Sequence, residues 1–95
     1  TSDNPRSEDP QEILDQVVAG AESVPAEQRG EVLVQIDRAA AIGLAVSRAR
    51  AGDVLVVAGK GHEQGQEVAG VVHPFDDRIA LRAELAARGF AGAAR

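Results

Sequence analysis

Hydrophobic positions follow helical spacing in the first part of the chain. Leu14 and Val17 recur with other apolar residues every three to four positions, which predicts a helix from about Pro10 to Ala21. Asp9 directly before it is a good N-cap, and the proline that follows suits the first helical position. The polar residues before Asp9 predict a loop.

Two more helices are expected further along the chain. Asp37 is an N-cap candidate for a helix that ends near Arg50, where an Ala-Gly-Asp turn follows. Asp76 or Asp77 caps a final helix. The apolar face of that last helix is predicted to comprise Ile79, Ala83, Ala86, Ala87 and Phe90.

Continuous apolar runs predict strands between these helices. Residues 31–36 and the β-branched run at residues 54–58 are typical of buried parallel strands, while residues 66–72 are weaker and suit a hairpin ended by Pro74. Strands that alternate with helices indicate an α/β fold with a mostly parallel sheet and flanking helices. The first helix lacks a strand before it, so we expect a domain truncated at its N-terminus.

Composition narrows the class of protein. The 95 residues include no cysteine and carry a formal net charge of −5. The lack of cysteine excludes a disulfide scaffold and a thiolate metal site. The acidic balance and the scattered basic residues argue against nucleic acid or an anionic membrane as partner. Neither a secretory signal nor a membrane-length apolar run is visible, and the chain starts without methionine. We therefore expect a fragment of a soluble, cytoplasmic protein.

The predicted topology brings separate loops together. In an open parallel sheet, ligands bind beyond the carboxyl ends of the strands. Residues 59–63 follow the clearest strand, and residues 37–38 follow the other. If a strand precedes Thr1, residues 2–6 leave its end as well, and all three segments share one edge.

The first of these loops suits a carboxylate. Pro5 stiffens the loop, Arg6 presents a planar guanidinium, and Asn4 can donate and accept beside it. The alternative is an Asx-turn with Arg6 paired to a nearby surface acid.

The second loop suits an ammonium group. Gly59 and Gly61 allow close approach to the backbone, and Glu63 is a candidate partner for a cation. The spacing matches neither a P-loop nor G-x-G-x-x-G. A flexible turn with solvated charges is the alternative.

Other chemistry is less well supported by the sequence. His62 and His73 are too few for a zinc site, so no metal ligands are expected. The serines lie outside any nucleophile elbow, and the aspartates are better explained as helix caps than as catalytic groups. No catalytic residue is therefore expected in this chain.

Three segments together resemble a known family. The motifs are T-S-D-N-P-R-S-E-D-P at residues 1–10, A-G-K-G-H-E at residues 58–63 and F-D-D-R at residues 75–78. Together they resemble the C-terminal domain of MurE-type Mur ligases over essentially the whole chain. These ligases act in bacterial peptidoglycan synthesis, where they couple ATP hydrolysis to amide-bond formation. The resemblance implies that residues 1–95 are part of a Rossmann-like, amino-acid-binding domain.

The resemblance also implies a substrate. A D-N-P-R loop is similar to that of members that add meso-2,6-diaminopimelate to UDP-N-acetylmuramoyl-L-alanyl-D-glutamate. Asn4 and Arg6 would hold the carboxylate of its distal centre, and Glu63 with the Gly59 backbone would hold the ammonium of that centre. The substrate-binding residues implied are Asp3, Asn4, Pro5, Arg6, Gly59 and Glu63.

The family pattern also has parts that this chain lacks. The central ATPase domain and the N-terminal UDP-binding domain are absent, so ATP and Mg²⁺ would bind mainly elsewhere, and this segment alone is expected to be inactive. The UDP-linked substrate would likewise be bound by the absent domains. The alternative is a noncatalytic α/β module that binds a small metabolite or nucleotide. Lys60, His62, Asp76 and Asp77 receive no role.

Overall fold

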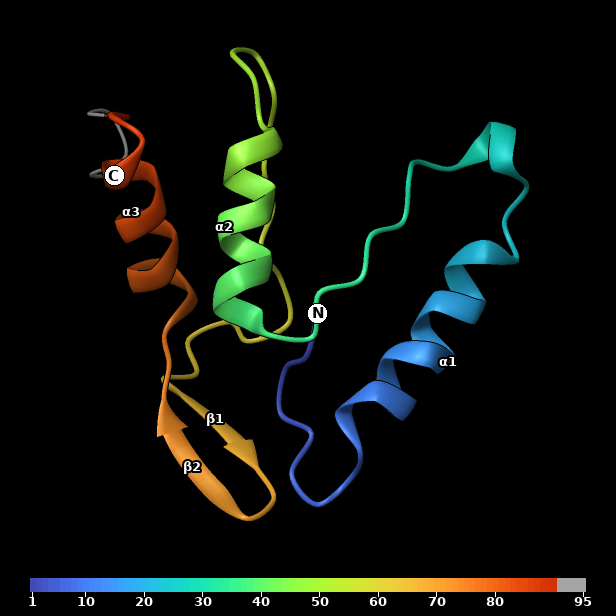
Figure 1. Cartoon of the computed structure of the whole chain (residues 1–95), viewed down its shortest axis with the longest axis vertical. Helices are drawn as coiled ribbons and strands as arrows, with labels where there is room; N and C mark the ends of the chain where they lie inside the picture. Colours follow the sequence, from blue (N-terminus) through green and yellow to red (C-terminus); the bar gives the residue numbers. More distant parts are fainter. Residues whose placement is uncertain (91–95) are drawn as a thin grey trace.

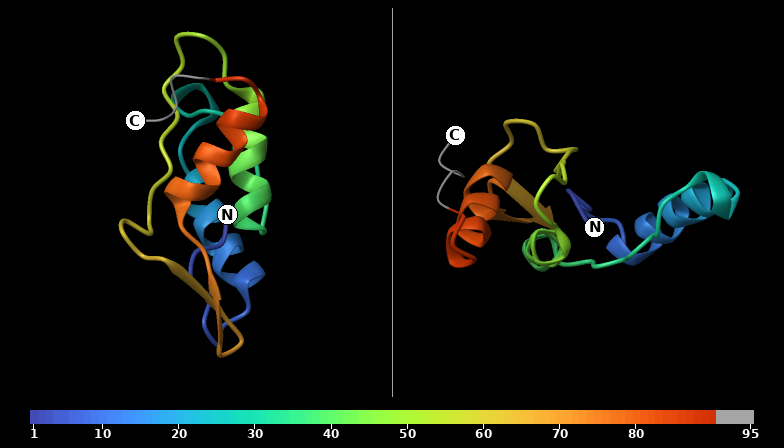
Figure 2. Two further views of the ribbon diagram at one scale, coloured as in Figure 1. Left: turned by 90° about the vertical axis from the view of Figure 1, so that its left-hand side faces the viewer. Right: turned by 90° about the horizontal axis from the view of Figure 1, so that it is seen from above.

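The computed structural model describes residues 1–90, so the expected domain of residues 1–95 extends slightly beyond the described part. The elements follow in the order α1 (Pro10–Glu22), a short 3-10 turn (Ala26–Gln28), α2 (Arg38–Arg48), β1 (Gly65–Val68), β2 (Val71–Pro74) and α3 (Asp77–Ala87). The molecule is a thin slab of 40 × 38 × 18 Å. Helices α2 and α3 lie side by side, β1 and β2 extend below them, and α1 stands apart (Figures 1 and 2).

The three predicted helices are confirmed, and an aspartate caps each of them. Asp9 accepts a bond from the backbone N–H of Gln11 at 2.8 Å, and Asp37 accepts one from that of Ala40 at 2.8 Å. Asp76, not Asp77, caps α3. Short polar side chains at these positions satisfy N–H groups that have no partner inside the helix.

The buried face of α3 differs from the predicted one. Ile79 is 66 % exposed and Phe90 lies beyond the helix end. The side chains that are buried or half-buried follow a different helical stripe, formed by Asp77, Ala80, Leu81, Glu84 and Leu85. This stripe faces α2, where Gly43 leaves room for Glu84: a Cβ at Gly43 would lie 3.1 Å from the Glu84 carboxylate.

The two predicted parallel strands are absent from the described residues. Residues 31–36 and 54–58 are extended but have no neighbouring strand, and Val54 and Val56 are 88 % and 75 % exposed. Residues 54–58 form no backbone–backbone hydrogen bond with the rest of residues 1–90. A strand requires a partner for its N–H and C=O groups, and apolar character alone does not supply one. The fold is thus a mixture of helices and one small sheet.

The predicted hairpin is confirmed, and it is antiparallel. Strands β1 and β2 pair with Gly65 opposite Pro74 and Val68 opposite Val71. Ala69 and Gly70 connect them with φ angles of 51° and 79°, as the tight primed hairpin turns require. Parallel pairing within the described residues is limited to a single bridge between Arg6 and Val68.

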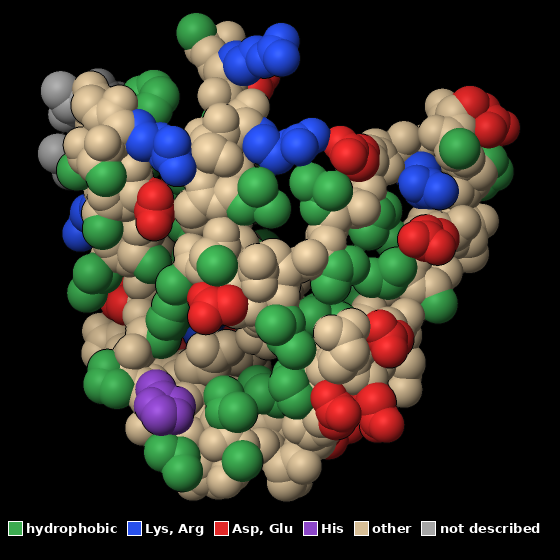
Figure 3. All heavy atoms as spheres, in the orientation of Figure 1, with side chains coloured by type: hydrophobic (Ala, Val, Ile, Leu, Met, Phe, Trp, Pro, Cys, Tyr) green, Lys and Arg blue, Asp and Glu red, His purple; other side chains and the backbone are tan. Residues whose placement is uncertain are grey.

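The core is small and aliphatic. Its buried side chains in residues 1–90 are Leu14, Ile42 and Val46, and Pro5 is buried in the first loop. Hydrophobic side chains also gather in the middle of the face between α1 and α2, where they remain accessible (Figure 3). Three polar or charged residues are also buried, and all of them lie near the predicted ligand loops: Arg38, Lys60 and Asp77.

Candidate functional site

Residues 1–6 lie along the free edge of β1 and are held there by backbone bonds. The Arg6 N–H donates to Glu67 O at 2.9 Å, and the Ala69 N–H donates to Arg6 O at 2.6 Å. These bonds hold Arg6 at φ 53°, a left-handed conformation that is costly for a residue with a Cβ. Strained backbone of this kind is concentrated at binding sites, where the surrounding structure enforces it.

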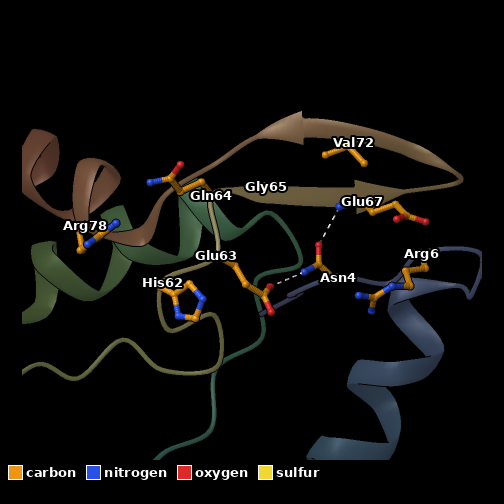
Figure 4. Close-up of a pocket in the computed structure, with 9 residues that line it drawn as sticks. All are labelled: Asn4, Arg6, His62, Glu63, Gln64, Gly65, Glu67, Val72 and Arg78. Carbon is orange, nitrogen blue, oxygen red and sulfur yellow. Dashed lines mark hydrogen bonds between the residues drawn. The ribbon is translucent and has the colours of Figure 1, made fainter.

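Asn4 joins the two predicted loops directly. Its Nδ2 donates to Glu63 Oε2 at 2.8 Å, and its Oδ1 accepts a bond from the Glu67 N–H at 2.7 Å. Both polar atoms of the amide are thus oriented by separate segments (Figure 4). The side chains of Asn4 and Glu63, 59 residues apart in sequence, meet as the sequence predicts.

A wide groove opens beside this contact. It has a volume of about 640 Å³ and combines two guanidinium and two carboxylate groups. In Figure 4, Glu63 lies between Arg6 near α1 and Arg78 near α3. We call this hollow the Arg6 groove. Its lining residues are Asn4, Arg6, His62, Glu63, Gln64, Gly65, Glu67, Val72 and Arg78.

A second cavity lies on the α1 side of the same loop. Its volume is about 320 Å³, and Ile13, Leu14 and Val17 form its apolar wall. Asp3 and Pro5 line this cavity rather than the Arg6 groove, whereas Asn4, Arg6 and Glu63 line both. The structure therefore brings three of the six predicted residues together at the boundary of two hollows.

Gly59 has a backbone role in the second loop. Its φ of 110° favours glycine, and a Cβ there would lie 3.5 Å from Asp3 Oδ2. Gly59 lines neither hollow. After it, the Glu63 N–H donates to Lys60 O at 3.0 Å, which forms a tight turn that ends at Glu63.

Lys60 is buried beneath this turn. It is only 2 % exposed, and its Nζ lies 2.9 Å from Asp3 Oδ1 and donates to Gly65 O at 2.7 Å. Asp3 Oδ1 is itself buried and accepts no hydrogen bond within residues 1–90, so the contact is an ion pair rather than an aligned hydrogen bond. The sequence carried no signal for this role, because a lysine in a polar, glycine-rich loop is expected to be solvated.

Arg38 anchors the start of both loops. Its guanidinium donates twice to the Asp77 carboxylate at 2.7 Å, once to Ser2 O at 3.0 Å and once to Ala58 O at 3.1 Å. Bonding to Asp77 raises the pKa of Arg38 above its usual value, against the effect of burial. One sequence feature hinted at this role. Arg38 lies in the first turn of α2, where the helix dipole disfavours a cation.

Asp76 and Arg78 form a bidentate pair at the α3 end of the groove. Arg78 Nε and Nη2 donate to the two carboxylate oxygens of Asp76 at 3.1 and 2.9 Å. These bonds lower the pKa of Asp76 from 3.8 to about 2. Asp76 thus remains ionised through the neutral range and leaves Arg78 partly neutralised.

Within residues 1–90, no cluster of three or more histidine or acidic side chains is arranged to hold a metal ion. None of the helices in that part of the chain has the length and apolar character to cross a membrane.

Known proteins resemble this chain closely. Residues 1–61 match the family model described as Mur ligase, glutamate ligase domain. The UDP-N-acetylmuramoyl-L-alanyl-D-glutamate--2,6-diaminopimelate ligase of Streptomyces coelicolor is 68 % identical over 86 % of this chain and 16 % of its own length. The ligase of the same name from Streptomyces avermitilis is 66 % identical over the same shares.

A solved structure agrees with these relatives. The structure titled as a UDP-N-acetylmuramoyl-L-alanyl-D-glutamate--2,6-diaminopimelate ligase superposes with a TM-score of 0.74 at 40 % identity, covering 92 % of this chain and 17 % of that one. This chain thus spans about one sixth of the length of the relatives it matches. Because the family model covers more than half of its residues, the chain belongs to the Mur ligase family.

Proposed function

We propose that this chain is the amino-acid-binding part of an ATP-dependent ligase that adds meso-2,6-diaminopimelate to UDP-N-acetylmuramoyl-L-alanyl-D-glutamate. The observation that carries the proposal is the meeting of Asn4, Arg6 and Glu63 at one edge of the Arg6 groove. Relatives up to 68 % identical have names that specify the same reaction. The enzyme would be bacterial and cytoplasmic.

The charges of these side chains suit a zwitterionic centre. The Arg6 guanidinium and the second Nδ2 hydrogen of Asn4 would bind its carboxylate. Glu63 Oε1 would bind its ammonium. Lysine lacks the distal carboxylate and would leave Arg6 without a partner, which a polar site rejects strongly.

The positions of Asp3 and Pro5 fit supporting roles. Pro5 is buried and fixes the backbone between Asn4 and Arg6, while the Asp3 carboxylate pairs with Lys60. We therefore assign direct ligand contacts to Asn4, Arg6 and Glu63, with Asp3 and Pro5 holding the first loop and Gly59, which lines neither hollow, shaping the second.

ATP and Mg²⁺ would be bound mainly by other parts of the enzyme. The donor set of this chain does not fit them, because it has neither a phosphate-binding P-loop nor, within residues 1–90, a cluster of acidic or histidine ligands. The UDP-linked substrate would also be bound outside this chain.

The Rossmann-like parallel sheet belongs to the same proposal. Residues 31–36 and 54–58 are mostly apolar and mostly exposed, as strands without neighbours would be. In the longer ligase, further strands would lie beside them and form the sheet.

Arg6→Ala tests the function. The assay uses a chimera of the Streptomyces coelicolor ligase in which this chain replaces the matching segment. A charge-assisted bond is worth about 1.5–3 kcal/mol, so the KM for meso-diaminopimelate should rise roughly 10- to 150-fold while the KM for ATP is unchanged. Arg82→Ala, an exposed arginine outside the groove, is the matched control. Equal losses for both substrates would contradict the proposal, and unchanged binding of diaminopimelate would favour a noncatalytic metabolite module.

A further inference from the structure

We propose that Lys60 is a positioning residue that sets the distance between the two arms of the diaminopimelate site, an inference that rests on the function proposed above. One arm carries Asn4 and Arg6, and the other carries Glu63. Lys60 lines neither the Arg6 groove nor the cavity beside α1, so it acts on the ligand through other residues.

The burial of Lys60 is unexpected for its position. It lies between two exposed glycines in a polar loop, yet its side chain is 0 % exposed. Lysine is almost never fully buried unless its charge is paired. Without a partner, the Lys60 side chain would point from the same loop into solvent. The side chain therefore folds beneath its own turn because specific partners lie there.

Its first partner closes the loop that presents Glu63. The ammonium donates to Gly65 O at 2.7 Å, while the carbonyl of Lys60 accepts the Glu63 N–H at 3.0 Å. The two bonds fix the chain on both sides of Glu63. Its carboxylate consequently projects from a closed turn toward Asn4 rather than from a free loop (Figure 4).

Its second partner belongs to the other arm. Nζ lies 2.9 Å from Oδ1 of Asp3, the residue immediately before Asn4. One buried ammonium thus connects residues next to each arm, and it does so across 57 positions of sequence. Long-range backbone bonds also attach residues 1–6 to the hairpin, and the Asn4 side chain donates to Glu63 itself, but Lys60 is the buried side chain that joins Asp3 to the backbone of the Glu63 turn.

The pair also balances charge near the ligand. Asp3 lies three residues from Arg6, and its carboxylate would oppose the substrate carboxylate that Arg6 is proposed to bind. Lys60 neutralises it, and no hydrogen bond within residues 1–90 replaces the ion pair at Oδ1. Lys60 and Asp3 should therefore act as one unit, and their removal should not be additive.

The test is a double-mutant cycle in the chimera described above. Lys60→Met should raise the KM for meso-diaminopimelate about tenfold or more, with kcat within about threefold and the KM for ATP within about twofold. Loss of folded enzyme would instead lower kcat in proportion and leave KM unchanged. Asp3→Asn should raise the same KM, and the double variant should be no worse than the worse single variant.

Several results would overturn the inference. An unchanged KM for diaminopimelate in Lys60→Met, a rise shared equally with ATP, or a double variant equal to the product of the singles would each do so. If Lys60→Met fails to fold, Asp3→Asn alone must still raise KM without a change in kcat. Arg6→Ala in the same assay separates the two proposals: if it raises KM and Lys60→Met does not, only the positioning role fails.

Discussion

The two loops at the candidate site and the two apolar segments at residues 31–36 and 54–58 differ in how their backbone is held. Residues 1–6 and 59–65 have no regular structure apart from the Arg6 bridge and the start of β1, yet buried cations and backbone bonds fix them. Residues 31–36 and 54–58 have the apolar composition of strands but form almost no backbone bonds within residues 1–90. Within residues 1–90, backbone hydrogen bonding therefore does not follow hydrophobicity.

Among the substitutions that test this difference, Arg38→Ala should lower the free energy of unfolding the most, because it removes the cation that holds both loops. Removing one partner of a buried pair typically costs about 3–5 kcal/mol, because the other charge remains buried. The free energy of unfolding, measured by urea titration, should fall by about this amount. Arg38→Met with Asp77→Leu should recover most of it, since neither charge then remains.

A matched exposed pair is the control for Arg38. Arg48 lies 2.7 Å from Glu31, the same distance as Arg38 from Asp77, but these side chains are 54 % and 64 % exposed. Arg48→Ala should cost less than about 1 kcal/mol. Similar losses in Arg38→Ala and Arg48→Ala would show that burial does not distinguish the ligand end.

Asp76→Asn should have a smaller, pH-dependent effect. Because the folded pKa is about 2 and the unfolded value is 3.8, the ionised carboxylate stabilises the fold above pH 3.8, and this stabilisation is lost as the pH falls toward 2. The urea midpoints of wild type and Asp76→Asn should differ at pH 6 and converge near pH 2. Arg78→Ala should remove the same pH dependence, since its bonds are the main cause of the lowered pKa. A constant difference from pH 2 to 6 would contradict this explanation.

Val56→Thr should have the smallest effect on the chain alone. Val56 is 75 % exposed, so the change in unfolding free energy should lie within about 0.5 kcal/mol. In the chimera, a covered parallel strand would bury the added hydroxyl at a cost of about 1–3 kcal/mol. Thermal unfolding of the two proteins would measure this contrast. Equal small effects in both would contradict the proposed parallel sheet.

The sequence predicts local features of this fold better than its pairings. Helix caps at Asp9, Asp37 and Asp76 and the hairpin depend on neighbouring residues, and the structure confirms them. The strands at residues 31–36 and 54–58 depend on backbone partners far away in sequence or outside the chain. Their apolar pattern indicated burial on two faces, but burial requires covering layers that residues 1–90 do not provide.

In the candidate site, too, local residue types were predictable from the sequence and long-range partners were not. The sequence pattern identified Asn4, Arg6 and Glu63, which the structure places together, through their residue types and the family resemblance. It did not reveal Arg38 and Lys60 as the groups that hold the loops, because a buried cation looks the same in sequence as a solvated one. Their roles follow from partners 20 to 57 positions away.

The attachment of both loops to Arg38 has a consequence for altering substrate choice. Its guanidinium binds the carbonyls of Ser2 and Ala58, each directly before a loop that contributes to the site. Arg38 therefore fixes the main chain ahead of both loops, upstream of the side chains proposed to contact the ligand and of the Lys60–Asp3 pair. If the proposed function holds, the side chains of residues 6 and 63 could be exchanged to accept another amino acid while Arg38 still holds the backbone ahead of both loops.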